Sequence, residues 1–485
     1  MTLALVGIFV SLALLIALAY RGHSVIVLAP LMALLAVLLA GAPILANYTQ
    51  VFMPALAGFI AQFFPLFLTG AIFGKLMADS GYAQDFAAWI SRLLGPQHAL
   101  LVTVIATALL TSGGVSAWVI VFTIFPIARS LFEQADIPRR LMPAAIALGI
   151  FTFATAALPG SPQIHNTIPT RFFQTNTFAA PFLGIIGAAI TFGLGMLWLW
   201  FRQRRLVAAG ESFGDLTHAE RRTGAVGPVG DEMDHLHTPD REPDGSARRG
   251  ITGLAPVAVV VATNALLTYL VIPAMDTGYL AEKRYGGVAL AQVASVWSVT
   301  AALVVASVVI FLMRPGSAGT YLAGLSEGAK NAVIPVFTTA SEVAYGATIA
   351  SLAAFALVRD GIFAISDNAL VTSVLSTSVI AAVTGSASGG LTISLNTFGE
   401  QLVQMATAQG ISMDLMHRAT AMASVGFDSP SQRRDHHPAR GHRALAPGVL
   451  QGHRHGHRRR PGRRAAGRDG ARSHLRQLLS RATVS

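Results

Sequence analysis

Two stretches of small and hydroxyl-bearing residues interrupt long apolar segments of this sequence. The first reads LLTSGGVSAW (109–118) and the second reads VTGSASGGLTIS (383–394). A glycine weakens a helix by about 1 kcal/mol relative to alanine, and freed backbone groups in lipid cost several kcal/mol each. Such breaks persist where protein or a water-filled cavity satisfies the backbone, and the new helix N-termini then offer N–H groups to an anion. Close helix packing through small residues would use the same residue types.

A third irregular stretch, ALPGSPQIHNTIPTRFF (157–173), combines three prolines and a glycine with apolar flanks. Proline and glycine end helices, so we interpret this stretch as a re-entrant turn inside the membrane. It would direct Gln163, His165, Asn166 and Thr167 inward. His165 could carry a proton, or it could be a structural histidine. The corresponding turn of the second half is expected at ASVGFDSP (423–430).

Glu342 is the only charged residue in the apolar stretch FTTASEVAYGATIASLAAF. Ionisable residues within membrane segments are candidates for function. Glu342 could couple substrate to proton flow as a protonated carboxyl, or it could hydrogen-bond a broken helix. No nucleophile–base pair and no metal-ligand spacing accompanies His165 and Glu342, so we expect no enzyme, no metal and no cofactor. A membrane-embedded enzyme and a channel remain as alternatives.

The composition places these residues in a membrane protein. Of 485 residues, 53% are hydrophobic and 12% are charged, the mean hydropathy is +0.56, and cysteine is absent. Soluble domains carry about 25% charged residues. Because a bilayer core requires about 20 apolar residues per helix, we predict about 10–12 membrane segments. The apolar stretches lie at 3–20, 24–39, 51–77, 100–131, 141–157, 181–201, 254–272, 289–313, 333–357, 368–405 and 411–424.

These segments form two clusters with one break each. Matched interruptions in two halves are typical of secondary transporters built from inverted repeats, so we predict an all-α polytopic membrane protein of that kind. The predicted parts are a first membrane repeat (1–201), a polar loop (202–250), a second and incomplete repeat (251–430) and a tail (431–485). Arginines flank both ends of the loop, which favours its cytoplasmic location.

Three stretches resemble the gluconate permease (GntP) family, within the ion-transporter superfamily of organic-anion carriers. They are GKLMADSGYAQ (74–84), ALPGSPQIHNTIPT (157–170) and TGSASGGLTISL (384–395). The resemblance covers most of residues 1–430 and is to an outlying branch, because TSGGVSAW and PGSPQIHN differ from the gluconate carriers. It implies a proton-coupled symporter of a sugar acid or a short hydroxycarboxylate such as 3-hydroxybutyrate. A carrier of citrate or another carboxylate that uses Na⁺ is the alternative.

The resemblance and the breaks together define the expected site and partners. Proton coupling is expected from Glu342 or His165. The partners would be a small organic anion, a proton or Na⁺, the lipid bilayer and a second copy of the chain in a homodimer, with no nucleic acid. The location would be a bacterial cytoplasmic membrane. The substrate-binding candidates are Thr111, Ser112, Gly113, Gly114, Pro162, Gln163, His165, Asn166, Thr167, Thr384, Gly385, Ser386, Ser388, Gly389 and Gly390.

The tail breaks the resemblance. Residues 431–485 contain fourteen Arg, no Lys and two acids, and they hold all of the excess positive charge of the chain. Family members continue here into a last apolar helix. Reading the codons of His436 onward one base later permits an apolar sequence similar to that helix. We therefore expect the tail to be an out-of-frame, disordered product. A basic tail that binds anionic lipid or nucleic acid is the competing interpretation.

Overall fold

The computed structural model describes residues 2–115, 117–214, 246–314, 318–384 and 386–426. Within these residues the regular secondary structure is helical throughout, as predicted. Six of the described helices are long and apolar enough to cross a membrane, or seven with the bent pair of α5 and α6. The prediction of an all-α polytopic membrane protein is confirmed. The polar-loop residues 215–245 and the tail lie outside the described residues.

The first half of the chain supplies the helices up to residue 208. A one-turn helix, α3 (Ile44–Asn47), and a π-helical turn, Tyr48–Phe52, lead into α4. The others are α1 (Thr2–Tyr20), α2 (Val25–Leu39), α4 (Met53–Asp79), α5 (Tyr82–Leu94), α6 (Ala99–Ser112), α7 (Ala117–Gln134), α8 (Met142–Phe151), α9 (Phe153–Ala156), α10 (Ile164–Phe173) and α11 (Pro181–Ala208).

The second half supplies the helices from residue 247 onward. A π-helical turn, Leu267–Val271, joins its first two helices. The helices of this half are α14 (Ala247–Leu266), α15 (Ile272–Ala274), α16 (Leu290–Met313), α17 (Ala318–Ser351), α18 (Phe355–Phe363), α19 (Ala369–Thr384), α20 (Ala387–Ala408) and α21 (Met413–Gly426).

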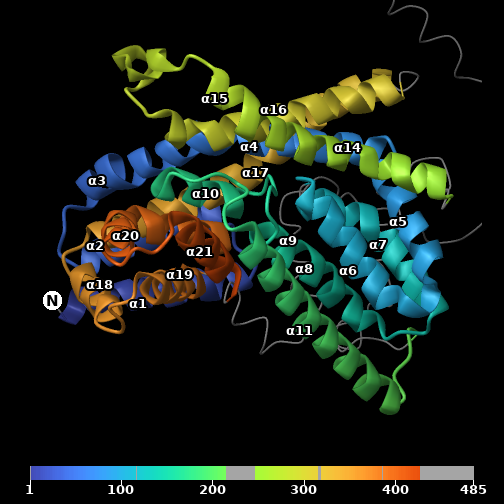
Figure 1. Cartoon of the computed structure of the whole chain (residues 1–485). Coiled ribbons are helices and arrows are strands. Elements are labelled where there is room, and N and C mark those ends of the chain that lie inside the picture. The colour runs from blue at the N-terminus through green and yellow to red at the C-terminus, as the bar shows by residue number, and fades with distance from the viewer. Residues whose placement is uncertain (1, 116, 215–245, 315–317, 385, 427–485) are drawn as a thin grey trace, which may run out of the picture. The chain divides into compact units, whose positions relative to one another are not determined.

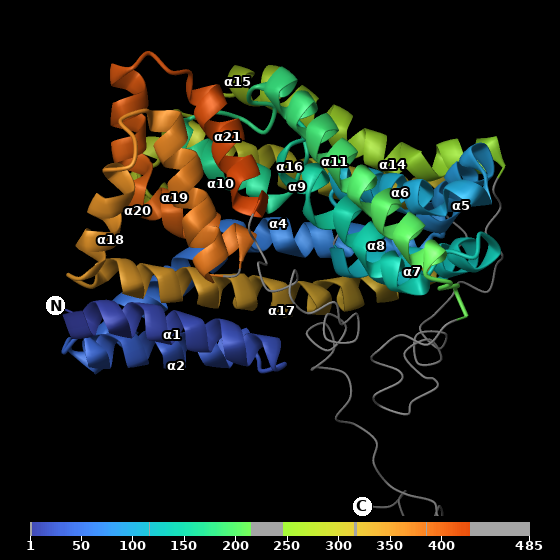
Figure 2. The same cartoon turned by 90° about the horizontal axis from the view of Figure 1, so that it is seen from below.

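Two long helices, α4 and α17, pack against each other along their length and run in opposite directions. Near the end of α4, Lys75 Nζ lies 3.1 Å from Glu327 Oε2, near the start of α17. Just before α4, Asn47 Oδ1 accepts a hydrogen bond of 3.4 Å from Ser351 Oγ, at the end of α17. The pair therefore runs antiparallel. In Figures 1 and 2, α5 to α8 lie at one end of this pair and α18 to α21 at the other.

The helices around this pair repeat the same order and the same contacts. Helix α2 packs on α17 as α16 packs on α4, and α1 packs on α2 as α14 packs on α16. In the first half α4, α5 and α6 precede a break, and in the second half α17, α18 and α19 precede the other break. Antiparallel pairing of the equivalent helices α4 and α17 is the arrangement that two inverted repeats produce.

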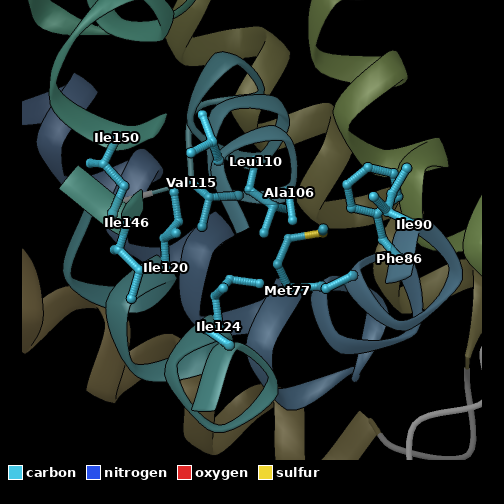
Figure 3. Packing of buried hydrophobic residues seen from close by; sticks show 14 of the residues in the cluster. Met77, Phe86, Ile90, Ala106, Leu110, Val115, Ile120, Ile124, Ile146 and Ile150 are labelled. Carbon is cyan, nitrogen blue, oxygen red and sulfur yellow. The ribbon is translucent and has the colours of Figure 1, made fainter. Parts of the chain in front are cut away.

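Apolar side chains form two separate cores. One joins α5 to α8 with parts of α4, α14 and α16, and Figure 3 shows Met77, Leu110, Val115 and Ile146 packed within it. The other joins α1, α2 and the beginning of α4 with α17 to α21. Ile164, the first residue of α10, packs against both cores. The N-terminus of α10 therefore lies between them.

Both predicted breaks are confirmed. Helix α6 ends at Ser112 and α7 begins at Ala117, while α19 ends at Thr384 and α20 begins at Ala387. Gly114 has a φ of +89°, which a residue with a side chain rarely adopts, and this conformation turns the chain out of α6.

The predicted re-entrant turn is shorter than the sequence indicated. The non-helical part covers residues 157–163, and residues 164–173 form α10 with Pro169 inside it. A proline removes only one hydrogen bond from a helix interior. The burial of Ile168 and Phe173 on the same short helix offsets that loss.

Candidate functional site

The first break and the turn before α10 contact each other directly. Gln163 Nε2 donates a hydrogen bond of 2.8 Å to the backbone oxygen of Thr111. A Cβ atom added at Gly114 would lie 2.7 Å from Pro162 Cγ, so only glycine allows this approach. These two segments, which are about fifty residues apart in sequence, therefore pack against each other.

The hydroxyl groups of this break are used by the helix itself. Thr111 Oγ1 donates to Thr107 O at 2.8 Å, and Ser112 Oγ donates to Ala108 O at 2.7 Å. Such bonds to the preceding turn satisfy a hydroxyl proton where no water is present. Each oxygen keeps lone pairs that can still accept a hydrogen bond. Gly113, which ends α6, packs against Val257 of α14.

His165 lies in the first turn of α10. Both of its ring nitrogens are shielded from solvent, and neither has a hydrogen-bond partner within the described part of the chain. The Oγ atom of Ser161, four residues earlier, is buried in the same way. Buried polar groups are nearly always paired, so unpaired ones are candidates for binding a ligand or water. Thr167 Oγ1 differs, since it donates to Gln163 O at 3.2 Å.

Asn166 is fully engaged in holding the turn. Its Nδ2 donates to the backbone oxygens of Ser161 at 2.9 Å and Thr177 at 2.8 Å. Its Oδ1 accepts from Arg418 Nη1 at 2.9 Å and lies 3.3 Å from His417 Nε2. These bonds use both amide hydrogens and the oxygen of Asn166, so its side chain positions the turn, and its contact with substrate stays a prediction.

Arg418 of α21 was not expected from the sequence. Its side chain is 0% exposed, and all five of its N–H groups have an acceptor in α10 or in the chain just before the turn and just after α10. Besides Asn166 these acceptors are backbone oxygens: Ala156 at 2.8 Å, Thr177 at 3.2 Å, and Ala179 at 3.0 Å from Nε and 2.8 Å from Nη2. The guanidinium therefore holds both ends of the segment that contains the turn and α10.

His417 completes this network. Its Nδ1 lies 2.6 Å from Thr175 Oγ1, just after α10, and its side chain is fully buried. A charged residue next to a histidine in the helical stretch MDLMHRATAMASVG is the signal that would have found both residues, since such groups are rare inside membrane segments.

The second break brings Glu342 to the start of α20. Ser386 caps this helix, because its Oγ accepts the backbone N–H of Gly389 at 3.1 Å. A Cβ atom added at Gly389 would lie 3.2 Å from Glu342 Oε2. Glu342 and the second break, which were both singled out from the sequence, therefore lie side by side.

The other predicted residues of the second break have mixed outcomes. A Cβ atom added at Gly390 would lie 2.4 Å from Ala381 Cα, so this glycine lets α19 and α20 approach at backbone distance. Ser388 is half-buried, and its backbone oxygen accepts from Thr392 Oγ1 at 2.8 Å. Gly385 and the side chain of Thr384 lie outside the described residues.

The two breaks do not form one cluster. Leu110 and Val115 around the first break belong to one core, and Leu391 and Ile393 after the second belong to the other. The start of α10 lies between these cores and carries His165. Among the described residues, no group of three or more His, Asp or Glu side chains could hold a metal ion.

Comparison with known proteins identifies the family. No protein-family model matches the chain. It is 38% identical over 431 residues to YxjC of Bacillus subtilis, which is described as an uncharacterized transporter; the match covers 88% of this chain and 89% of YxjC. An uncharacterized transporter of Haemophilus influenzae is 30% identical over 149 residues, which cover 30% of this chain and 33% of that protein. The chain is thus a multi-pass membrane protein that belongs to the transporter family of YxjC.

Proposed function

We propose that this transporter is a proton-coupled symporter of a small organic acid in the bacterial cytoplasmic membrane. The resemblance to the gluconate permease family supports a sugar acid or a short hydroxycarboxylate such as 3-hydroxybutyrate as substrate. The two broken helices support a carrier, because half-helix ends near the middle of a membrane are typical binding sites of secondary transporters.

The observation that carries the proposal is the imidazole of His165. It lies in the first turn of α10, where the helix dipole and free backbone N–H groups favour an anion. Its two nitrogens have no partner in the described chain. A substrate carboxylate that accepts a hydrogen bond from this imidazole would supply the missing partner. A histidine ring can also bind and release a proton, which suits a group that takes up a proton together with an anion.

Glu342 is the second candidate for proton coupling. It lies beside Gly389, at the start of α20. A charged carboxylate is strongly disfavoured in apolar surroundings, and protonation removes that charge. In this proposal one proton on Glu342 or on His165 accompanies each cycle in which the substrate anion is carried.

Uptake by purified protein in liposomes tests the proposal. We would compare the chain as printed with a form whose reading frame after Ser431 is restored, and offer labelled gluconate, 3-hydroxybutyrate and citrate. A pH gradient, acidic outside, is expected to drive accumulation of at least one acid, and a protonophore should abolish it. If a Na⁺ gradient alone drives the uptake, Na⁺ is the coupling ion and the proposed coupling to protons is wrong. If neither folded form accumulates any of these acids, the proposed function is wrong.

A further inference from the structure

Three side chains, two at or just before the start of α10 and one on α16, have buried polar atoms without a hydrogen-bond partner in the described chain. Two are Ser161 and His165, and the third is Thr300 of α16, whose Oγ1 is equally shielded. Thr300 is 135 residues away from His165 in sequence, so its location depends on how α16 packs against α10.

Contacts at both ends fix the direction of α16 relative to α10. At the end of α10, Arg171 and Phe172 line a pocket of about 310 Å³ together with Gln292 of α16. Before the start of α10, Pro162 and Leu303 both lie within 3 Å of the position that a Gly114 Cβ would occupy. Residue numbers on α16 therefore rise as those on α10 fall.

This antiparallel register places Thr300 beside the first turn of α10. Both helices rise by about 1.5 Å per residue, so residues between the two ends pair by counting. Arg171 with Gln292 and Pro162 with Leu303 bracket a pairing in which Thr300 lies level with residues 163–165. Direct packing of α10 on α16 agrees with this register.

We propose that Thr300, His165 and Ser161 together bind the carboxylate group of the substrate, a short hydroxycarboxylate or sugar acid. This inference rests on the proposed function and names the residues of its site. Two hydroxyl groups and one imidazole N–H can donate three hydrogen bonds to a carboxylate at the positive end of the α10 dipole.

The polar side chains beside these three residues are already used. Asn166 and Arg418 donate all of their hydrogen-bonding hydrogens to the turn, to α10 and to the chain on either side of them, and Thr167 donates to Gln163 O. In this site the carboxylate is thus bound by the two hydroxyl groups, the imidazole and backbone N–H groups. Arg418 acts as a positioning residue that keeps the first turn of α10 in place.

Binding measurements on purified protein with the Thr300→Val variant test the inference. Valine keeps the shape of threonine and removes only the hydroxyl group. We expect the dissociation constant for 3-hydroxybutyrate or gluconate to rise about tenfold, the equivalent of one hydrogen bond, and Thr300→Ser to restore binding. The ligand-free Tm should stay the same or rise, because no partner of the hydroxyl is lost.

Thr103→Val is the matched control. This buried threonine donates its hydroxyl hydrogen to Ala99 O at 2.8 Å in α6, so its replacement should leave the dissociation constant unchanged. If Thr300→Val binds the acid as the wild type does, the inference is overturned and the proposed function stands. A lower ligand-free Tm for Thr300→Val would show a structural partner and would also overturn the inference. If the wild type binds neither acid, the proposed function and this site both fail.

Discussion

At the scale of single residues, the polar groups around α10 divide by whether the chain already satisfies them. Arg418, His417 and Asn166 satisfy one another and the backbone of the turn. His165 and Ser161 have no partner in the described residues. The first group should therefore matter for stability, and the second should matter for ligand binding.

Replacement of His165 should impair transport with little effect on folding. Within the described residues its ring has no hydrogen bond to lose, so the Tm of His165→Gln should stay close to that of the wild type. Proton-driven uptake should fall by about tenfold or more, because the substrate loses a buried hydrogen-bond partner. His98→Gln is the control, since His98 is exposed and its Nδ1 lies 2.7 Å from Leu94 O. Full uptake by His165→Gln would contradict its role.

Replacement of Arg418 should instead destabilise the protein. Methionine fills a similar volume and leaves several buried acceptors unpaired, so we expect Arg418→Met to lose about 3 kcal/mol or more of unfolding free energy. Arg418→Lys should recover part of this loss, because an ammonium group has only three donors. Thermal denaturation in detergent measures the effect. Arg359→Lys at an exposed position of α18 should change the Tm little, and an unchanged Tm for Arg418→Met would refute the structural role.

The sequence revealed only part of this site. His165 was visible because it follows a proline- and glycine-rich turn, and Glu342 was visible because it is a lone charge in an apolar segment. Arg418 could have been noticed as a charge next to a histidine, but its role and that of Thr300 depend on contacts with residues more than one hundred positions away. No local spacing encodes such contacts.

At the scale of helices, glycine decides how closely the two breaks pack. Gly390→Ala would place Cβ 2.4 Å from Ala381 Cα. This atom belongs to the backbone of α19, which cannot rotate away as a side chain can. We expect α19 and α20 to separate, with a loss of about 1–3 kcal/mol of unfolding free energy. Gly58 of α4 has open space around its missing Cβ, so Gly58→Ala should stabilise the protein by up to about 1 kcal/mol. Equal Tm values for the two variants would contradict this packing.

The antiparallel pairing of α4 and α17 can be tested by cross-linking, because the chain contains no cysteine. A disulfide should form readily in the double variant Asn47→Cys, Ser351→Cys, whose side chains are in hydrogen-bond contact in the structure. The pair Asn47→Cys, Glu327→Cys should remain unlinked, since Glu327 lies at the opposite end of α17 beside Lys75. Cleavage between the two positions followed by electrophoresis distinguishes the products. Cross-linking of the second pair alone would show that α4 and α17 run in the same direction, which contradicts the structure.

Helix positions were predictable where composition changes sharply, and less so elsewhere. The glycine pairs located both breaks. Helix α5 was missed because Tyr82–Leu94 is amphipathic and carries charges, so it lacks the apolar run that marks a spanning helix. Helix α17 begins at Ala318, before the predicted apolar stretch at 333, and its polar first turns pair with α4 through Lys75 and Glu327.

At the scale of the whole molecule, the order of the first repeat shows what should follow α21. After α7, the first repeat continues with α8, α9, the turn and α10, which carries His165. After α20, the second repeat continues with α21, and the equivalents of the turn and α10 would begin at about residue 427. That part of the sequence contains the switch to arginine and histidine and lies outside the described residues.

We therefore predict that restoring the reading frame after Ser431 restores transport. In the proposed symporter each repeat supplies a re-entrant turn followed by a helix. The printed sequence keeps both only in the first repeat, because the second turn, expected at 423–430, runs into the arginine-rich tail. Two proteins with identical residues 1–430 should differ in uptake, with the restored form active and the printed form poorly active. Resequencing the codons for residues 423–440 should reveal an extra or missing base. An intact frame with equal uptake by both forms would show that one re-entrant turn suffices, and the arginine-rich tail would then be a genuine part of the transporter.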